Sequence, residues 1–441
     1  MRELRHGLGT AWRVARAEGL RAAVDRARDR LDERRERRRA VTVTRGGLGQ
    51  APVLSVLGMP FSSRLGGVPT QLRNRLAFES QERRCAVLHP EGRGWRLETA
   101  YRTERRVLNS GDVSLIEAIR WALGETGATA VHLEGLAGMT ENDLGALARP
   151  GARLVITVHD YSAFCRRTHL IERPHDRFCE YCRDLDRCQA CLGQDFDVAP
   201  GQQAEYRRRT AELLRSADAV VFVSRFLRDV HVELVPGLDV ARLHVIEPGT
   251  PPVTGATPRA PGPLRHAAWV GAAHAYKGAL VFPDVMRQLN ADGPLLRWSA
   301  LGGGDARLLA LFRALPGVAV RGYWRSGTLP LVLRRRAVDL ALLLSVTPEA
   351  YGLTLDECWR AGVPVVAFDH GAMAERIRRL GGGILVPASE GAAGIARAVR
   401  QAVAGPPPAV PMPERLPEPR HAAAAHLELY RGLGLLPAGS A

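Results

Sequence analysis

The chain has 441 residues, a length at which two domains are the usual expectation. Hydrophobic residues make up 46% of it, which is ample for real cores, but no uninterrupted apolar stretch is long enough to predict a membrane-spanning helix. The formal net charge of +15 favours anionic partners such as nucleotides, nucleic acid or anionic lipid surfaces, without choosing among them. The N-terminal segment is charged throughout and lacks the apolar core of a signal peptide, so we expect a cytoplasmic protein.

Residues 1–45 are predicted to form a basic helical extension. The first 40 residues hold thirteen arginines and seven acidic residues among thinly spaced apolar positions. Alternating charge of this kind is typical of a solvated helix face. Trp12 and the arginines would also suit an interfacial helix, so peripheral contact with a membrane is the second interpretation.

From residue 46 onward, short β-rich runs alternate with helical patterns. Strands of an N-terminal domain, residues 46–247, are predicted at 51–58, 84–90, 129–135, 153–158, 218–224 and 243–247. Residues 248–263 are rich in Pro, Gly, Thr and Ala and are predicted as a linker.

The same rhythm returns after the linker, in a C-terminal domain predicted at residues 264–410. Its strands are predicted at 267–271, 297–303, 318–322, 339–345, 363–368 and 383–387. Runs that are apolar on both faces, separated by helices, predict parallel sheets covered by helices on each side. Residues 411–441 are expected to form a tail with a helix at 421–433, which could fold back on either domain.

Ligands of open α/β sheets bind at the carboxyl ends of the strands, so the loops after the predicted strands are candidates for the chemistry. Lys277 is the only lysine in the chain, and it follows the first strand of the C-terminal domain at the predicted start of a helix. A helix N-terminus and an ammonium group both attract anions. We therefore expect Lys277 to bind a phosphate, with a lysine retained by chance as the alternative.

The strongest signal is the segment SVTPEAYGLTLDECWRAGVPVVAF at 345–368. Glu349 lies in the loop before a predicted helix, and Glu357 lies in the early turns of that helix. A carboxylate can accept two hydrogen bonds from a vicinal diol, so the pair could hold a sugar and a ribose at opposite ends of a diphosphate. The backbone amides between them would face the phosphates, namely those of Gly352, Leu353 and Thr354.

Two loops of the N-terminal domain are weaker candidates. Gly66 and Gly67 precede a predicted helix, where adjacent glycines allow a phosphate to approach the backbone amides; a plain turn is the alternative. His159 and Asp160 follow a predicted strand. A histidine there either hydrogen-bonds a substrate hydroxyl or carbonyl, or has a structural role.

Five of the seven cysteines lie within residues 165–194. Four of them form two Cys-x-x-Cys pairs: Cys179, Cys182, Cys188 and Cys191. In a reducing compartment such pairs indicate a structural zinc site more than disulfides. An iron–sulfur cluster and an unligated loop are the alternatives. We expect a metal here to shape the acceptor pocket and to take no part in the chemistry.

Together these motifs resemble the family-four group of retaining glycosyltransferases. The resemblance covers residues 51–435. It rests on GGV (66–68), HD (159–160), VSRF (223–226), VIEPGT (245–250), YKG (276–278), LGGG (301–304), PEAYGLTLDE (348–357) and AGVPVVAFDHGAMAERI (361–377). It implies an α/β protein of the GT-B fold, with two doubly wound Rossmann-like domains facing a cleft. It also implies retaining transfer of a hexosyl group from a nucleotide-diphosphate sugar, with no metal or other cofactor needed for catalysis.

The resemblance implies a role for each candidate residue. Lys277 would neutralise the donor diphosphate, while Glu349 would bind hydroxyls of the transferred sugar and Glu357 the donor ribose. The remaining implied contacts are Gly67 with the diphosphate, His159 with the transferred sugar, and Trp324, within GYWR (322–325), with the nucleobase. Glu349, Lys277 and His159 are thus the expected catalytic residues.

Two departures from the family pattern affect the expected site. The stretch GAAHA (271–275) lacks the arginine that often accompanies the lysine, so the hold on the diphosphate would be weaker unless Arg64 or Arg325 compensates. The start of the linker carries Glu247 where asparagine is usual.

The partners implied are a nucleotide-diphosphate sugar and a glycan, lipid-linked or small-molecule acceptor. A GT-B sugar-nucleotide epimerase is the alternative within the enzymes. A zinc-containing nucleic-acid-binding protein is the alternative from another class. Aromatic residues, at 6%, are too few and scattered for a nucleic-acid-binding stripe, so we expect no nucleic acid partner.

Overall fold

The computed structural model describes Val24 and residues 51–61, 67–148, 151–253, 262–290, 295–324 and 327–437. The chain divides into two compact units. The C-terminal unit contains Pro251–Leu416, the short segment His175–Phe178 and Val24. The N-terminal unit contains the described residues between 51 and 174, Cys179–Thr250 and the end of the chain from Pro417. Apart from Val24, the predicted extension at 1–45 lies outside the described residues, as do residues 254–261 of the predicted linker.

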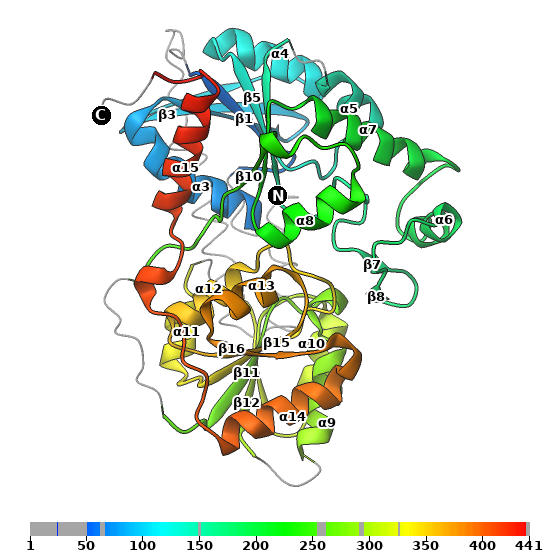
Figure 1. Ribbon diagram of the computed structural model, residues 1–441, viewed down its shortest axis with the longest axis vertical. Coiled ribbons are helices and arrows are strands. Elements are labelled where there is room, and N and C mark those ends of the chain that lie inside the picture. The colour runs from blue at the N-terminus through cyan, green and yellow to red at the C-terminus, as the bar shows by residue number, and fades with distance from the viewer. Residues whose placement is uncertain are drawn as a thin grey trace, which may run out of the picture. The chain divides into compact units, whose positions relative to one another are not determined.

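The N-terminal unit is built on an eight-stranded sheet with the order β10-β9-β6-β5-β1-β2-β3-β4 (Figure 1). Its strands are β1 (Val53–Val56), β2 (Cys85–Glu91), β3 (Gly94–Tyr101), β4 (Glu104–Asn109), β5 (Ala130–Glu134), β6 (Arg153–Val158), β9 (Ala219–Phe222) and β10 (Leu243–Val245). All six predicted strands of this sheet are present.

Two strands of this sheet, β3 and β4, were not predicted. They pair antiparallel with β2 and with each other, so the sheet is mixed, whereas a parallel one was expected. Polar residues are interspersed along both strands, which read GWRLETAY and ERRVLN, and β4 has a single buried position. A search for runs that are apolar on both faces therefore passes over them.

The helices of the N-terminal unit are α3 (Gly67–Glu82), α4 (Leu115–Thr126), α5 (Glu141–Leu147), α6 (Leu185–Leu192), α7 (Gln202–Ser216), α8 (Arg225–Leu234) and α15 (Pro419–Gly432). α4 shows how local sequence sets their ends. Ser114 and Glu117 form a reciprocal capping box at its start, and Gly127 ends it in the left-handed conformation. Within the described part of the chain, no helix combines the length and apolarity that crossing a bilayer requires.

Helix α15 comes from the end of the chain and packs against α3 (Figure 1). Its Tyr430 is fully buried in a small cluster with Val53 of β1 and Ala130 of β5. The final helix is therefore part of the N-terminal unit, although 166 residues, 251–416, separate it from the rest of that unit.

The C-terminal unit is built on a six-stranded parallel sheet with the order β13-β12-β11-β14-β15-β16. Its strands are β11 (His266–Val270), β12 (Arg297–Leu301), β13 (Val318–Arg321), β14 (Leu340–Leu343), β15 (Val365–Phe368) and β16 (Gly383–Val386). The helices between and after them are α9 (Val281–Asn290), α10 (Ala306–Arg313), α11 (Leu329–Arg335), α12 (Leu353–Arg360), α13 (Gly371–Leu380) and α14 (Gly391–Ala404). Each predicted strand of this sheet is observed.

Both faces of this sheet are buried, as the alternation along β11 shows. Ala267 and Trp269 belong to a core cluster that also holds residues of α9, α10 and α14. Ala268 and Val270 belong to a second cluster, with residues of α11, α12 and α13. The unit is thus a doubly wound sandwich of helices around a parallel sheet.

In both sheets the strand order reverses beside the first strand. β12 and β13 lie on one side of β11, and β14 to β16 lie on the other. In the N-terminal unit, β1 lies in the same way between β2 and β5. At such a switch point the loops after the two strands run to opposite sides, which leaves a crevice at the carboxyl ends where ligands of this fold class bind.

Candidate active site

Lys277 and Glu349 meet at the switch point of the C-terminal sheet. Lys277 lies in the loop after β11 and Glu349 in the loop after β14, and the Lys277 ammonium forms an ion pair with the Glu349 carboxylate. The two residues are 72 positions apart in sequence. The neighbouring positions of β11 and β14 in the sheet therefore bring them together.

Lys277 does not begin a helix, contrary to the sequence prediction. It ends a short 3₁₀ turn, Ala275–Lys277, and α9 starts only at Val281. Gly278 follows in the left-handed conformation, with φ 76°, which ends the turn. The anion-attracting group of this loop is therefore the ammonium itself and not a helix terminus.

The Glu349 carboxylate also accepts a hydrogen bond from the hydroxyl of Ser345. The side chains of Lys277 and Glu349 remain 28% and 17% exposed. Burial alone would lower the pKa of Lys277, but the Glu349 carboxylate outweighs it and the pKa is raised. The ammonium is thus charged and, with three donors, can bind a further anion while keeping its bond to Glu349.

The N-terminus of α12 opens beside this pair. Gly352 precedes the helix in the left-handed conformation, with φ 81°, and offers no side chain to cap it. A Cβ at this position would lie 2.6 Å from Cγ of Met373, so only glycine fits. The first amides of a helix have no intrahelical acceptor, which leaves those of Leu353 and Thr354 suited to an anion.

Glu357 lies in the same helix, and its side chain is half-buried. Burial, together with the neighbouring Asp356 carboxylate, raises the pKa of Glu357 to about 8. The group is thus mostly protonated at neutral pH. Hydrogen bonds donated by a ribose diol would favour the ionised form and lower this pKa.

We expect Glu357→Gln to change how the stability of the protein depends on pH. The pKa of Glu357 in the folded protein lies above its ordinary 4.5, so stability is lost as the pH rises from about 4.5 to about 8 and then levels off. Glutamine does not titrate, so the variant should melt a few degrees above the wild type at pH 8.5 and close to it at pH 5. Calorimetric melting across this range checks the prediction, and parallel curves for the two proteins would contradict it.

Sequence analysis missed two polar residues near Glu349, Ser345 and His370. His370 precedes α13 and lies 2.8 Å, through Nε2, from the carbonyl oxygen of Ser345. Burial lowers the pKa of His370 despite the nearby carboxylates. Ser345 ends one predicted strand and His370 follows the next, so the expectation that strand ends and the loops after them carry the chemistry could have identified them.

A buried ion pair involves α12, the helix that carries Glu357, and the sequence patterns did not predict it. Asp356 of α12 and Arg376 of α13 form it with both side chains fully buried. The hydroxyl of Tyr351 donates to Asp356 at 2.9 Å. Adjacent acidic residues are common on helices, so nothing in the sequence distinguished buried Asp356 from its half-buried neighbour Glu357.

The other predicted site residues lie at strand and helix ends. Trp324 follows β13, is partly buried, and lies 3.4 Å from where a Cβ of Gly302 would be. In the N-terminal unit, Gly67 is the exposed first residue of α3, and His159 follows β6 directly. Arg64 and Arg325, named above as compensating cations, lie outside the described residues.

The four paired cysteines lie around one pocket. Cys179 and Cys182 form a turn after the two-residue strand β8 (Arg177–Phe178), whereas Cys188 and Cys191 lie on α6. With Cys165 they line one pocket. Among the described residues, however, no three or more His, Cys, Asp or Glu side chains are grouped as metal ligands.

The zinc prediction is therefore not supported. Burial raises the pKa of Cys165 to about 12 and that of Cys188 to about 11. Cys-x-x-Cys spacing places two thiols near each other within a pair, but it does not determine how the two pairs face each other.

Comparison with known proteins identifies the C-terminal unit. Residues 264–404 match the sequence family described as Glycosyl transferases group 1. Residues 264–404 therefore carry the sequence pattern of this family of glycosyltransferases. The match spans β11 to α14 and includes Lys277, Glu349 and Glu357. No curated protein sequence matches the chain.

Solved structures confirm the two-unit fold predicted from sequence. Sucrose-phosphate synthase from Thermosynechococcus elongatus aligns with a TM-score of 0.56 at 15% identity, over 87% of this chain and 99% of that one. HepE from Anabaena, solved with UDP, aligns with a TM-score of 0.53 at 14% identity, over 87% and 100%. A glycosyltransferase from Rickettsia africae ESF-5 gives 0.51 at 16% identity, over 88% and 97%. At these identities the likeness concerns the fold.

Proposed function

We propose that this glycosyltransferase moves a hexosyl group from a nucleoside diphosphate sugar to a glycan, lipid-linked or small-molecule acceptor, with retention of configuration. The donor class is supported by the family match and by the chemistry of the C-terminal crevice. HepE has been solved with UDP and with UDP-glucose, so UDP-sugars are the first donors to test. We further propose that the reaction takes place in the cytoplasm.

The observation that carries the proposal is the ion pair between the only lysine and Glu349 at the switch point of the C-terminal sheet. An ammonium placed there, beside the open N-terminus of α12, suits a diphosphate. A carboxylate held at the same point suits the hydroxyls of the sugar attached to that diphosphate.

In the proposed reaction, the bond between the anomeric carbon and the donor phosphate oxygen breaks. A bond from the acceptor oxygen forms on the same face of the sugar, and the acceptor proton passes to the leaving phosphate. Lys277 and the amides of Leu353 and Thr354 balance the charge that develops on the diphosphate. Glu349 orients the sugar through its hydroxyls, and Glu357 binds the ribose.

We expect Lys277→Ala to remove most of the stabilisation by UDP. Ligand at 100 times its Kd stabilises a protein by about 2.7 kcal/mol, which for a unit of this size raises Tm by about 5–10 °C. A charge-assisted bond to phosphate contributes about 1.5–3 kcal/mol, so its loss should remove most of that shift. Thermal melting with UDP, UDP-glucose and the corresponding GDP and ADP compounds tests the prediction.

The matched control is Arg287→Ala, which removes a basic residue from the exposed face of α9 in the same unit. This variant should respond to UDP as the wild type does. Equal stabilisation of wild type and Lys277→Ala by every nucleotide would refute the phosphate role. Conversion of the donor sugar into its epimer, without transfer or hydrolysis, would favour the epimerase alternative.

A further inference from the structure

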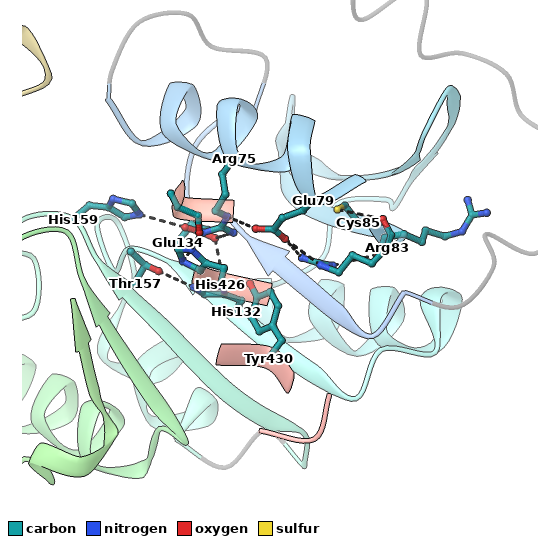
Figure 2. Close-up of polar contacts among 12 residues, drawn as sticks. Arg75, Glu79, Arg83, Cys85, His132, Glu134, Thr157, His159, His426 and Tyr430 are labelled. Carbon is teal, nitrogen blue, oxygen red and sulfur yellow. Dashed lines mark hydrogen bonds and ion pairs between the residues drawn. The ribbon is translucent and has the colours of Figure 1, made fainter. Parts of the chain in front are cut away.

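A network of buried polar side chains lies in the N-terminal unit, near the carboxyl ends of β5 and β6 (Figure 2). Four elements contribute to it: α3, β5, the end of β6 and α15. Its centre is Glu134, the last residue of β5, whose side chain is 1% exposed. One oxygen of Glu134 accepts a hydrogen bond from Arg75 at 2.6 Å, and the other lies 3.3 Å from Nε2 of His159.

Glu134 is ionised in this setting. Burial would raise its pKa, but the Arg75 guanidinium outweighs burial and holds the pKa of Glu134 well below its usual range. An ionised carboxylate has no proton to donate. Nε2 of His159 must therefore carry the hydrogen in this contact, and in the neutral ring Nδ1 is left as an acceptor.

That acceptor is not used within the described part of the protein. Nδ1 of His159 is buried and has no hydrogen-bond partner there. The His159 side chain as a whole is only 7% exposed. A buried acceptor without a partner costs free energy unless a ligand satisfies it. A sugar hydroxyl, which can donate one hydrogen bond, is a ligand of the required kind.

We propose that Glu134 is a positioning residue: it fixes His159 in the tautomer whose Nδ1 accepts a hydrogen bond from a hydroxyl of the transferred sugar. The inference rests on the proposed function, because it takes His159 as a contact of the donor sugar. It assigns the histidine the role of an acceptor and not that of a proton donor.

The rest of the network holds Glu134 and Arg75 in place. Arg75 lies 2.8 Å, through Nε, from Glu79 on the same helix, and it donates to Nε2 of His426 at 3.0 Å. Nδ1 of His426 lies 2.8 Å from the carbonyl oxygen of Ala422, so His426 donates there and accepts from Arg75. Helix α15 thereby supplies His426, which begins a series of contacts that runs through Arg75 and Glu134 to His159.

His132 closes the network on its other side. It hydrogen-bonds Tyr430 of α15 at 2.7 Å and Thr157 of β6 at 2.7 Å. Burial lowers the pKa of His132 to about 3, and it lowers that of His426 as well, so both rings are neutral. Arg75 therefore balances the charge on Glu134, and the rings of His132 and His426 carry no positive charge that would pair with it.

A double-mutant cycle on Glu134→Gln and His159→Ala tests the proposal. A glutamine can present its NH₂ group to Nε2, which would reverse the tautomer and turn Nδ1 into a donor. We expect Glu134→Gln to lower kcat for release of UDP from a UDP-sugar by 10- to 100-fold, the usual effect of removing a group that orients a functional histidine. KM and the thermal shift with UDP should stay within about twofold, because the diphosphate is proposed to bind the C-terminal unit.

In the His159→Ala background, Glu134→Gln should have no further effect on kcat, because its action passes through the missing ring. Glu134→Asp, which keeps the charge, should recover part of the rate. The matched control is Glu98→Gln, which removes a carboxylate 3.2 Å from Nε2 of another buried histidine, His89, and should leave kcat unchanged. Independent, additive losses from Glu134→Gln and His159→Ala would overturn the proposal.

A second measurement covers the case in which Glu134→Gln does not fold. Nitrogen-15 spectra of the histidine rings in the wild type, with His159 assigned by its loss in His159→Ala, report the tautomer directly. The proposal requires hydrogen on Nε2, and hydrogen on Nδ1 would overturn it. Failure of the proposed function has a different signature, since the wild type would then neither be stabilised by a UDP-sugar nor release UDP from it.

Discussion

Glu349→Gln is expected to lower the rate of sugar transfer by a factor on the order of 10²–10³, with no loss of affinity for UDP. The variant keeps the shape of the side chain but removes the negative charge that accepts hydrogen bonds from Lys277 and Ser345. The proposed hydroxyl contacts with the transferred sugar weaken, and so does the orientation of its anomeric carbon. Lys277 loses its counter-charge and is left available to the diphosphate, so UDP should bind as tightly as before or more tightly.

The measurement combines steady-state release of UDP from a UDP-sugar with titration of UDP by calorimetry. Glu390→Gln is the matched control, because Glu390 lies in the same unit and forms an exposed ion pair with Arg397. It should leave both quantities unchanged. A Glu349→Gln variant that loses UDP affinity while keeping kcat would show that the carboxylate serves the nucleotide and not the sugar.

Arg376→Met is expected to lower the free energy of unfolding of the C-terminal unit by about 3–5 kcal/mol. Methionine fits the space of the aliphatic stem but leaves the Asp356 carboxylate buried without its cation. Burial already raises the pKa of Asp356 even with Arg376 beside it. Both side chains of the pair are 0% exposed, so water cannot replace the missing partner.

Arg378→Met on the same helix is the control, because Arg378 is 59% exposed and its pairing with Asp369 is a surface contact. Surface pairs contribute about 0–1 kcal/mol. Denaturant unfolding of the three proteins gives the comparison. The double variant Asp356→Asn with Arg376→Met should recover part of the loss, since it removes the unpaired charge. Equal stabilities for the two single variants would contradict the assignment of Asp356–Arg376 as a buried pair.

Local sequence patterns predict which residues belong to the candidate site, but they do not predict the contacts between those residues. Glu349, Glu357 and Lys277 could be named from sequence because their residue types and loop positions are local properties. The ion pair between Lys277 and Glu349 could not be derived, because it depends on β11 and β14 being neighbours in the sheet. The predicted helix start at Lys277 failed for a local reason: Gly278 ends the turn before α9 begins.

The N-terminal unit shows the same division more sharply. His159 was visible as a histidine after a strand, but Glu134 is one of many acidic residues and carries no local mark of its role. Its importance comes from Arg75 on α3 and from His426 on a helix that follows more than 160 residues of another unit. A buried charge needs partners from wherever the fold can supply them, and sequence spacing does not tell which these are.

By itself, the sequence determined the alternation of strands and helices, because burial on both faces of a parallel sheet requires continuous apolar runs that are visible locally. It also predicted the residues that we propose for the donor half of the site. Only the tertiary structure decided that β3 and β4 add an antiparallel edge and that the last helix joins the N-terminal unit. Both outcomes depend on the free energy of tertiary contacts, which a local sequence pattern does not predict.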